Sequence, residues 1–188
     1  MLELRDVTLE RNKVKILSNV NLKVNEGETI VLTGPSGCGK STLIRVALGL
    51  IKPQSGEVLF EGVNLLALSD EGLRRKRHKM GIVFQEFQIL EHFTVLENVL
   101  LALWEGTRNK KIAEEALRSV GLWEKRFRYP KQLSGGEKQR VGIARALALD
   151  PDIIFWDEPT AALDPMYVHE ILRIMDSLAQ RKTMLVVT

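Results

Sequence analysis

The sequence predicts an α/β fold in which helices cover a mostly parallel sheet. Short apolar runs typical of strands alternate with stretches of helical spacing, which is the pattern of a parallel sheet covered by helices. A long stretch in the middle, residues 85–149, is predominantly helical and predicts a lobe inserted into that sheet. Residues 1–84 and 150–188 are expected to form the α/β core, so that the chain makes a single domain.

The strands and helices are predicted in chain order from periodicity and turn residues. Residues 1–32 read as β, with alternating apolar positions near 2–7 and 20–24 and a short apolar run at 29–32. A helix is expected from Lys40 to about Leu50, ended by Lys52-Pro53. Further strands are expected at 57–60, 81–84, 153–156 and 183–187, and further helices at 69–79 and 166–180.

Composition and charge exclude some classes of protein. The 188 residues are 45% hydrophobic and 27% charged, with a net charge of +3, which is ordinary for a globular protein and gives no reason to expect a nucleic-acid partner. The basic run 74–79 is interpreted as a solvated helix face. A nucleic-acid patch and a contact with anionic lipid headgroups are less favoured alternatives. One cysteine, Cys38, excludes an internal disulfide and suits a reducing compartment. We find neither a signal peptide nor an apolar stretch of about 18 residues, so any membrane role must come through a partner.

A glycine-rich loop carries the strongest chemical signal. Gly34-x-x-x-x-Gly39-Lys40-Ser41 stands between an apolar strand and a helix, as a phosphate-binding loop requires, and this context disfavours an incidental Gly-rich turn. Glycines let backbone N–H groups converge on phosphate oxygens, and the helix N-terminus adds partial positive charge. Lys40 can neutralise the β- and γ-phosphates, and the Ser41 hydroxyl can ligate Mg²⁺. The predicted nucleotide contacts are Gly34, Pro35, Ser36, Gly37, Cys38, Gly39, Lys40, Ser41 and Thr42, with Cys38 as a bystander and not a nucleophile.

An acidic pair follows the apolar run 153–156. Successive side chains of a strand point to opposite sides, so Asp157 and Glu158 can do different work. Asp157 is predicted to hold the Mg²⁺ shell together with Ser41, and Glu158 to act as general base toward water. Many buried strands end in acids, so the pair gains its meaning from the phosphate loop. Trp156 is interpreted as a core residue between sheet and helix.

A third motif is Leu133-Ser134-Gly135-Gly136-Glu137-Lys138-Gln139-Arg140, directly before an amphipathic helix. Ser134 is placed to cap that helix, and the two glycines permit close approach of the backbone to an anion. The alternative is an ordinary N-cap. Physical reasoning alone does not say that this second anion site serves the same nucleotide.

This segment closely resembles the signature motif of ABC transporters. With the phosphate loop and Asp157-Glu158 in order, the chain resembles an ABC transporter ATPase from about residue 2 to residue 188. Val83-Phe84-Gln85 is similar to the Q-loop of that family, and 161–164 to its D-loop. The resemblance implies a P-loop NTPase fold with an N-terminal antiparallel β subdomain. It also implies that Gln85 senses metal and water beside the catalytic Glu158 and Lys40.

The resemblance further implies partners, location and activity. MgATP would lie between the phosphate loop of one subunit and the signature of a second copy, in a head-to-tail homodimer. The signature contacts would be Ser134, Gly135, Gly136 and Glu137. The helical lobe would receive a coupling helix from an integral-membrane subunit at the cytoplasmic face of the membrane, and hydrolysis of ATP to ADP and phosphate would drive transport. The alternatives are a cassette that binds ATP but turns it over poorly, and a soluble ABC protein that acts on DNA or ribosomes.

Three departures from the family pattern shape further expectations. Arg11 aligns where an aromatic residue usually stacks on adenine, and a guanidinium can also stack, so Arg11 and Val14 are predicted adenine contacts. Glu137 replaces the more general Gln, a variant that looks like the lipoprotein-release, macrolide-export and cell-division group. The switch histidine of the family follows the strand that matches 183–188. The chain is therefore expected to be cut short before it and to hydrolyse ATP slowly.

Overall fold

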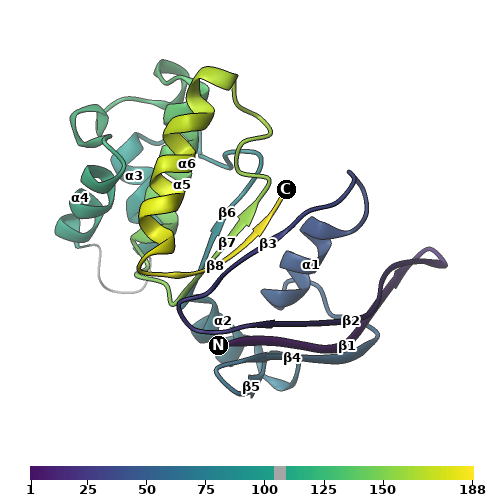
Figure 1. Ribbon diagram of the computed structural model, residues 1–188. Coiled ribbons are helices and arrows are strands. Elements are labelled where there is room, and N and C mark those ends of the chain that lie inside the picture. The colour runs from purple at the N-terminus through teal and green to yellow at the C-terminus, as the bar shows by residue number, and fades with distance from the viewer. Residues whose placement is uncertain (104–108) are drawn as a thin grey trace.

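Two sheets organise the computed structural model, which describes residues 1–103 and 109–188 (Figure 1). The antiparallel sheet has the strand order β2-β1-β4-β5, and the parallel sheet has the order β3-β8-β7-β6. The strands are β1 (Leu2–Arg11), β2 (Val14–Val24), β3 (Thr29–Leu32), β4 (Ser55–Phe60), β5 (Val63–Asn64), β6 (Met80–Val83), β7 (Ile153–Asp157) and β8 (Thr183–Val187). The predicted α/β fold class is confirmed, with the N-terminal strands in a separate antiparallel sheet.

Helices lie on both sides of the parallel sheet, with α1 on one side and α3 to α6 on the other (Figure 1). The helices are α1 (Lys40–Ala47), α2 (Asp70–Arg77), α3 (Val95–Leu100), α4 (Lys110–Ser119), α5 (Gly135–Leu147) and α6 (Pro165–Ala179). In sequence, α3, α4 and α5 all fall between β6 and β7, where the helical lobe was predicted. Residues 104–108 of that stretch lie outside the described residues. None of the helices in the described ranges combines the length and the apolar character that crossing a membrane requires.

The parallel sheet separates two hydrophobic cores. On β7, Ile153 and Phe155 belong to a cluster with α1 and the antiparallel sheet, whereas Ile154 and Trp156 belong to a cluster with α3, α4, α5 and α6. This alternation follows from the period-two geometry of a strand that is covered on both faces. Trp156 is fully buried, so its interpretation as a core residue is confirmed.

Two predicted boundaries were wrong. Helix α1 ends at Ala47 and not at Leu50, because Gly49 takes a left-handed conformation with φ 65° and the Leu50 N–H bonds back to the Arg45 carbonyl at 2.8 Å. A Cβ on Gly49 would also lie 2.9 Å from the Leu73 side chain, so packing adds to the conformational reason. The helical stretch predicted from residue 85 begins only at α3, after a non-helical segment at 85–94.

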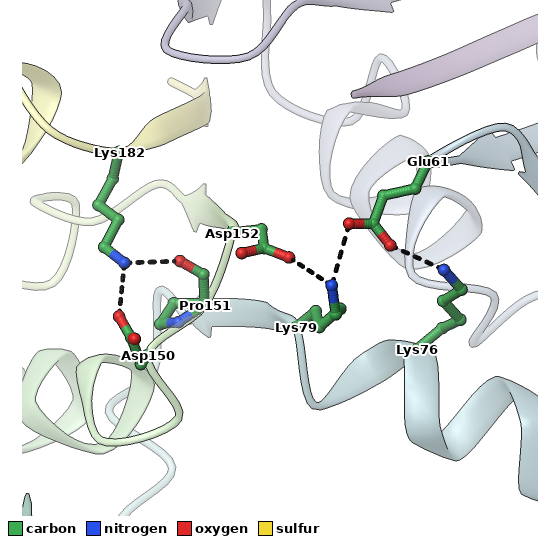
Figure 2. A network of polar contacts seen from close by, with 7 residues as sticks. All are labelled: Glu61, Lys76, Lys79, Asp150, Pro151, Asp152 and Lys182. Atoms are coloured by element: carbon green, nitrogen blue, oxygen red, sulfur yellow. Dashed lines mark hydrogen bonds and ion pairs between the residues drawn. The ribbon is translucent and has the colours of Figure 1, made fainter.

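An ion network ties the two sheets together at the amino ends of the parallel strands (Figure 2). Glu61, which follows β4, accepts hydrogen bonds from Lys76 at 2.7 Å and from Lys79 at 3.0 Å. Lys79 also lies 3.1 Å from Asp152, directly before β7. The hydrogen bonds from Lys76 and Lys79 lower the pKa of Glu61. No residue of α2 is fully buried, but the interpretation of its basic run as a solvated face was only partly right, because Lys76 and Lys79 bond Glu61 and Arg77 donates to the carbonyls of Leu48 at 2.9 Å and Gly49 at 2.7 Å.

Candidate active site

The carboxyl ends of the parallel strands bring distant motifs to one edge of the sheet. Val83 of β6 is paired with Trp156 of β7, and Val187 of β8 is paired both with Asp157 and with Leu32 of β3. Since the strands run in the same direction, the segments that follow them open at the same edge. Those segments are the phosphate loop after β3, Gln85 after β6 and Glu158 after β7.

The phosphate loop is shaped by two glycines and one lysine. Gly37 and Gly39 take left-handed conformations with φ 79° and 102°. A Cβ on Gly39 would lie 2.9 Å from the Ile16 carbonyl oxygen, so a side chain is excluded there by both conformation and space. The Lys40 ammonium donates to the carbonyls of Gly34 at 2.7 Å and Pro35 at 3.0 Å, which turns it back over the loop.

A pocket of about 220 Å³ lies against this loop. Its lining residues are Ile16, Gly37, Gly39, Lys40, Ser41, Thr42 and Glu158. Ile16 was not among the predicted site residues. The sequence gives little indication that Ile16 belongs to the site. Ile16 shares a strand face with Val14, but it reaches the pocket only through its contact with Gly39, which lies 23 positions later in the chain (39 − 16).

The predicted adenine contacts do not line this pocket. Arg11 and Val14 are paired with each other across the end of the β1–β2 hairpin. Asn12 and Lys13 form its turn with φ 50° and 64°, as a two-residue hairpin loop requires. Val14 is 64% exposed, so its side chain is accessible to a ligand, but this exposure does not identify the ligand. The adenine contact stays a prediction.

The acidic pair faces the first turn of α1. The Ser41 hydroxyl donates to an Asp157 carboxylate oxygen at 2.6 Å, and Asp157 is only 5% exposed. The Lys40 ammonium lies 3.8 Å from a Glu158 carboxylate oxygen. The two acids thus meet two different residues of the phosphate loop, although Glu158 lies just beyond β7 and strand alternation does not set its direction.

Glu158 stands at an unusual point of the backbone. Its φ is 45°, in the left-handed region that non-glycine residues rarely occupy, and its N–H donates to the Val187 carbonyl at 2.9 Å. Such conformations persist where the surrounding structure determines them, and they gather at functional sites. The pairing with β8 is that determinant here, since it holds the peptide in place while the side chain reaches the pocket.

The signature segment forms the N-terminus of α5. Ser134 and Glu137 make a reciprocal capping box, with Glu137 N–H to Ser134 Oγ at 3.3 Å and Ser134 N–H to Glu137 Oε2 at 2.9 Å. The predicted cap is confirmed. Burial opposes ionisation of Glu137, but the Lys125 ammonium and the Ser134 N–H outweigh it and lower its pKa. Both Glu137 oxygens are therefore used inside its own chain.

Gly136 has a packing reason that the sequence did not indicate. A Cβ there would lie 2.8 Å from the Cβ of Tyr167 on α6, so the missing side chain admits α6. The residues Ser134, Gly135, Gly136 and Glu137 are not among those that line the phosphate pocket. Within one chain, the described structure does not bring the two anion sites together.

Comparison with known proteins decides the family. A family model described as ABC transporter matches residues 17–161, which is more than half of the chain. The chain belongs to the ABC transporter family. A dimeric ATP-binding cassette, MJ0796 in a post-hydrolysis state bound to ADP and Pi, superimposes with a TM-score of 0.89 at 39% identity. That match covers 100% of this chain and 88% of MJ0796, so the ABC transporter fold extends over the whole sequence.

Curated relatives of this ABC transporter protein carry the names of amino-acid transport proteins. The arginine transport ATP-binding protein ArtM of Bacillus subtilis is 42% identical, over 100% of this chain and 80% of its own length. The methionine import ATP-binding protein MetN of Carboxydothermus hydrogenoformans is 45% identical over 91% of this chain. The chain spans about half of that protein, 52%. These names differ from the lipoprotein-release, macrolide-export and cell-division group that the Glu137 variant suggested, although the family prediction is confirmed.

Proposed function

We propose that this chain binds MgATP in the pocket at the phosphate loop and hydrolyses it to drive a membrane transporter. The observation that carries the proposal is the meeting of two loop residues with two acids. Ser41 touches Asp157 at 2.6 Å, and Lys40 lies 3.8 Å from Glu158, beside a glycine loop able to approach phosphates. Names of relatives that contain "ATP-binding" support the choice of nucleotide.

The residues present fit a magnesium ion. A serine hydroxyl and a carboxylate in contact are oxygen ligands of the kind that Mg²⁺ takes, together with waters and phosphate oxygens. The described residues include no cluster of three His, Cys, Asp or Glu side chains. That pattern fits an ion bound mainly through its nucleotide. When bound, the ion supplies positive charge to the β- and γ-phosphates, and Ser41 and Asp157 would hold it, with Gln85 close by.

The remaining chemistry falls to side chains of this chain. Lys40 exchanges its bonds to the Gly34 and Pro35 carbonyls for bonds to phosphate oxygens. Glu158 accepts a proton from the water that attacks the γ-phosphorus, while the bond from that phosphorus to the β–γ bridging oxygen breaks. Gln85, at the matching end of the neighbouring strand, orients that water. ADP and phosphate leave.

A second copy and a membrane subunit complete the proposal. The signature N-terminus of α5 offers backbone N–H groups to an anion and lies outside the phosphate pocket of its own chain, so it serves the nucleotide of a partner chain. The dimeric state of the similar cassette supports this arrangement. Residues 85–149, as a lobe distinct from the core of 1–84 and 150–188, would dock an integral-membrane partner. The protein would then sit peripherally at the cytoplasmic face of the membrane.

The decisive experiment measures steady-state phosphate release with MgATP, beside calorimetric binding of ATP. Reconstitution with a candidate integral-membrane partner in vesicles would test the coupling of hydrolysis to transport. A chain that is folded by circular dichroism but neither binds ATP nor releases phosphate from it would contradict the proposal. Binding without release would favour the alternative of a cassette that binds ATP and turns it over poorly.

A further inference from the structure

A buried amide on α5 joins the two segments that carry the proposed catalytic residues. Gln139 is 1% exposed, and its Nε2 donates to the Phe84 carbonyl at 3.3 Å and to the Pro159 carbonyl at 2.9 Å. Phe84 directly precedes Gln85, and Pro159 directly follows Glu158. The amide nitrogen of Gln139 therefore bonds both the residue just before Gln85 and the residue just after Glu158.

The orientation of this amide is set by chemistry. Both partners are carbonyl oxygens, which only accept, so the NH₂ group must face them. Its Oε1 is buried and has no hydrogen-bond partner among the described residues. An unpaired buried acceptor carries a desolvation penalty. A buried leucine would avoid that penalty, so the residue type is explained by the two bonds that its nitrogen donates.

The same face of α5 follows the Gln85 segment further. Arg145, six residues after Gln139, donates to the Gln88 carbonyl at 2.7 Å. Between them, a Cβ on Gly142 would lie 3.6 Å from the Phe87 carbonyl oxygen. Residues spaced by three share a helix face, so α5 lies along 84–88 as one rigid edge. The helix that begins at the signature thus borders the segment that contains Gln85.

We propose that Gln139 is a positioning residue of the hydrolysis reaction. It acts through the peptides of Phe84 and Pro159, and so sets Gln85 and Glu158 relative to each other and to the signature helix. The inference rests on the proposed function, because these two residues are assigned to the attacking water there. Gln139 does not line the nucleotide pocket, and its side chain links the α5 helix to both catalytic segments.

The kinetic test uses Gln139→Leu, which removes both donors and keeps a buried side chain of similar size. The turnover number should fall about 10–100-fold, since small misplacement of catalytic groups has this effect. The KM for ATP and its calorimetric affinity should stay near the parental values. Gln139→Met is the second variant, because it keeps the unbranched shape if the leucine disturbs packing.

Asn98→Leu is the matched control. Asn98 is also a buried amide at 1% exposure, and it donates to the carbonyls of Leu90, Phe93 and Thr94 at 3.0–3.1 Å, none of which adjoins Gln85 or Glu158 in the sequence. Its variant should lower thermal stability but leave the turnover number near parental. An equal fall in turnover for both variants would overturn the inference, because loss of any buried amide would then explain it. Unchanged turnover in both Gln139 variants would overturn it as well.

Two further readouts separate this inference from the proposed function. In a Glu158→Gln background, Gln139→Leu should add little further loss of turnover, whereas independent residues would add their effects.

Amide hydrogen exchange tests the positioning role without measuring activity. Gln139→Leu should speed exchange in both 84–88 and 158–162, and Asn98→Leu only around 90–94. If the parental chain fails to hydrolyse ATP, the proposed function fails. Unchanged exchange at 84–88 and 158–162 would sink the positioning role instead.

Discussion

The hydroxyl of Ser41 lies 2.6 Å from the carboxylate of Asp157, and this bond joins the first turn of α1 to the carboxyl end of β7. The contact spans 116 positions of sequence and lies beside the phosphate loop. A buried carboxylate needs such partners, because an unpaired charge in the interior is costly. The pair is the natural point at which to test the proposed ion site.

Asp157→Asn should weaken the apparent affinity for the Mg²⁺ that supports hydrolysis. The amide keeps the shape and can still bond Ser41, but it lacks the charge that a cation requires. We expect the Mg²⁺ concentration for half-maximal phosphate release to rise about 10–100-fold, the usual effect of disturbing a metal site. Asp152→Asn, at the opposite end of the same strand, should leave it unchanged. Equal Mg²⁺ curves for Asp157→Asn and the parent would refute the assignment.

Lys40→Ala should lower the affinity for ATP at least about a hundredfold, because a charge-assisted bond to phosphate is lost in a partly buried pocket. Isothermal calorimetry with MgATP measures it. Lys79→Ala, in the network at the far edge of the sheet, is the control and should bind as the parent does. If Lys40→Ala bound ATP with the parental affinity, the assignment of residues 34–41 as the phosphate-binding loop would be wrong.

Glu158→Gln should keep ATP binding and slow hydrolysis by about 10²–10⁴-fold, since the amide cannot accept the proton. The backbone with φ 45° accepts glutamine as well as it accepts glutamate, so the fold should not change. The ATP-bound dimer should accumulate and elute earlier in size-exclusion chromatography with MgATP. A parental rate of phosphate release would rule out Glu158 as the base.

Ser134→Arg should block the ATP-dependent dimer but spare nucleotide binding by the monomer. The bulky cation enters the interface, while the phosphate pocket of the same chain does not include Ser134. Ser134→Ala is the control, because it removes the cap, at a cost of about 1 kcal/mol, without adding bulk. Light scattering reports the dimer and calorimetry the binding. Equal loss of monomer binding would mean that the signature acts within its own chain.

The Glu61 network predicts a pH dependence of stability. Hydrogen bonds from Lys76 and Lys79 lower the pKa of Glu61 in the folded protein from 4.5. The ionised network therefore stabilises the fold above about pH 4.5, and this stabilisation is lost as the pH falls through the folded pKa of Glu61. Glu61→Gln should therefore lower Tm at pH 7, and the difference from the parent should shrink toward pH 3 and at high salt. Glu71→Gln, which breaks an exposed pair with Arg75, should change Tm little. A constant Tm difference across pH would contradict the network.

Elements with a strong local code were predicted well. Strands β3 and β8 coincide with the apolar runs at 29–32 and 183–187. The cap at Ser134 was readable because a serine followed three residues later by Glu137 satisfies orphan N–H groups locally. By contrast, the end of α1 was misplaced because Gly49 closes it and packs against Leu73, a contact that no local pattern displays.

The sequence by itself determined the α/β class, the phosphate loop, the acidic pair and the signature, because spacing within a few residues sets their chemistry and their local conformation. Only the tertiary structure decided which of them meet. The parallel strand order β3-β8-β7-β6 brings Ser41 to Asp157 and Lys40 toward Glu158. Contact between β2 and the phosphate loop places Ile16 in the pocket, and Ser134 lies outside it. The packing of α5 places Gln139 between two catalytic segments. Contacts between residues 20 to 120 positions apart depend on how sheets and helices pack, and that packing is a property of the whole chain, which no short pattern contains.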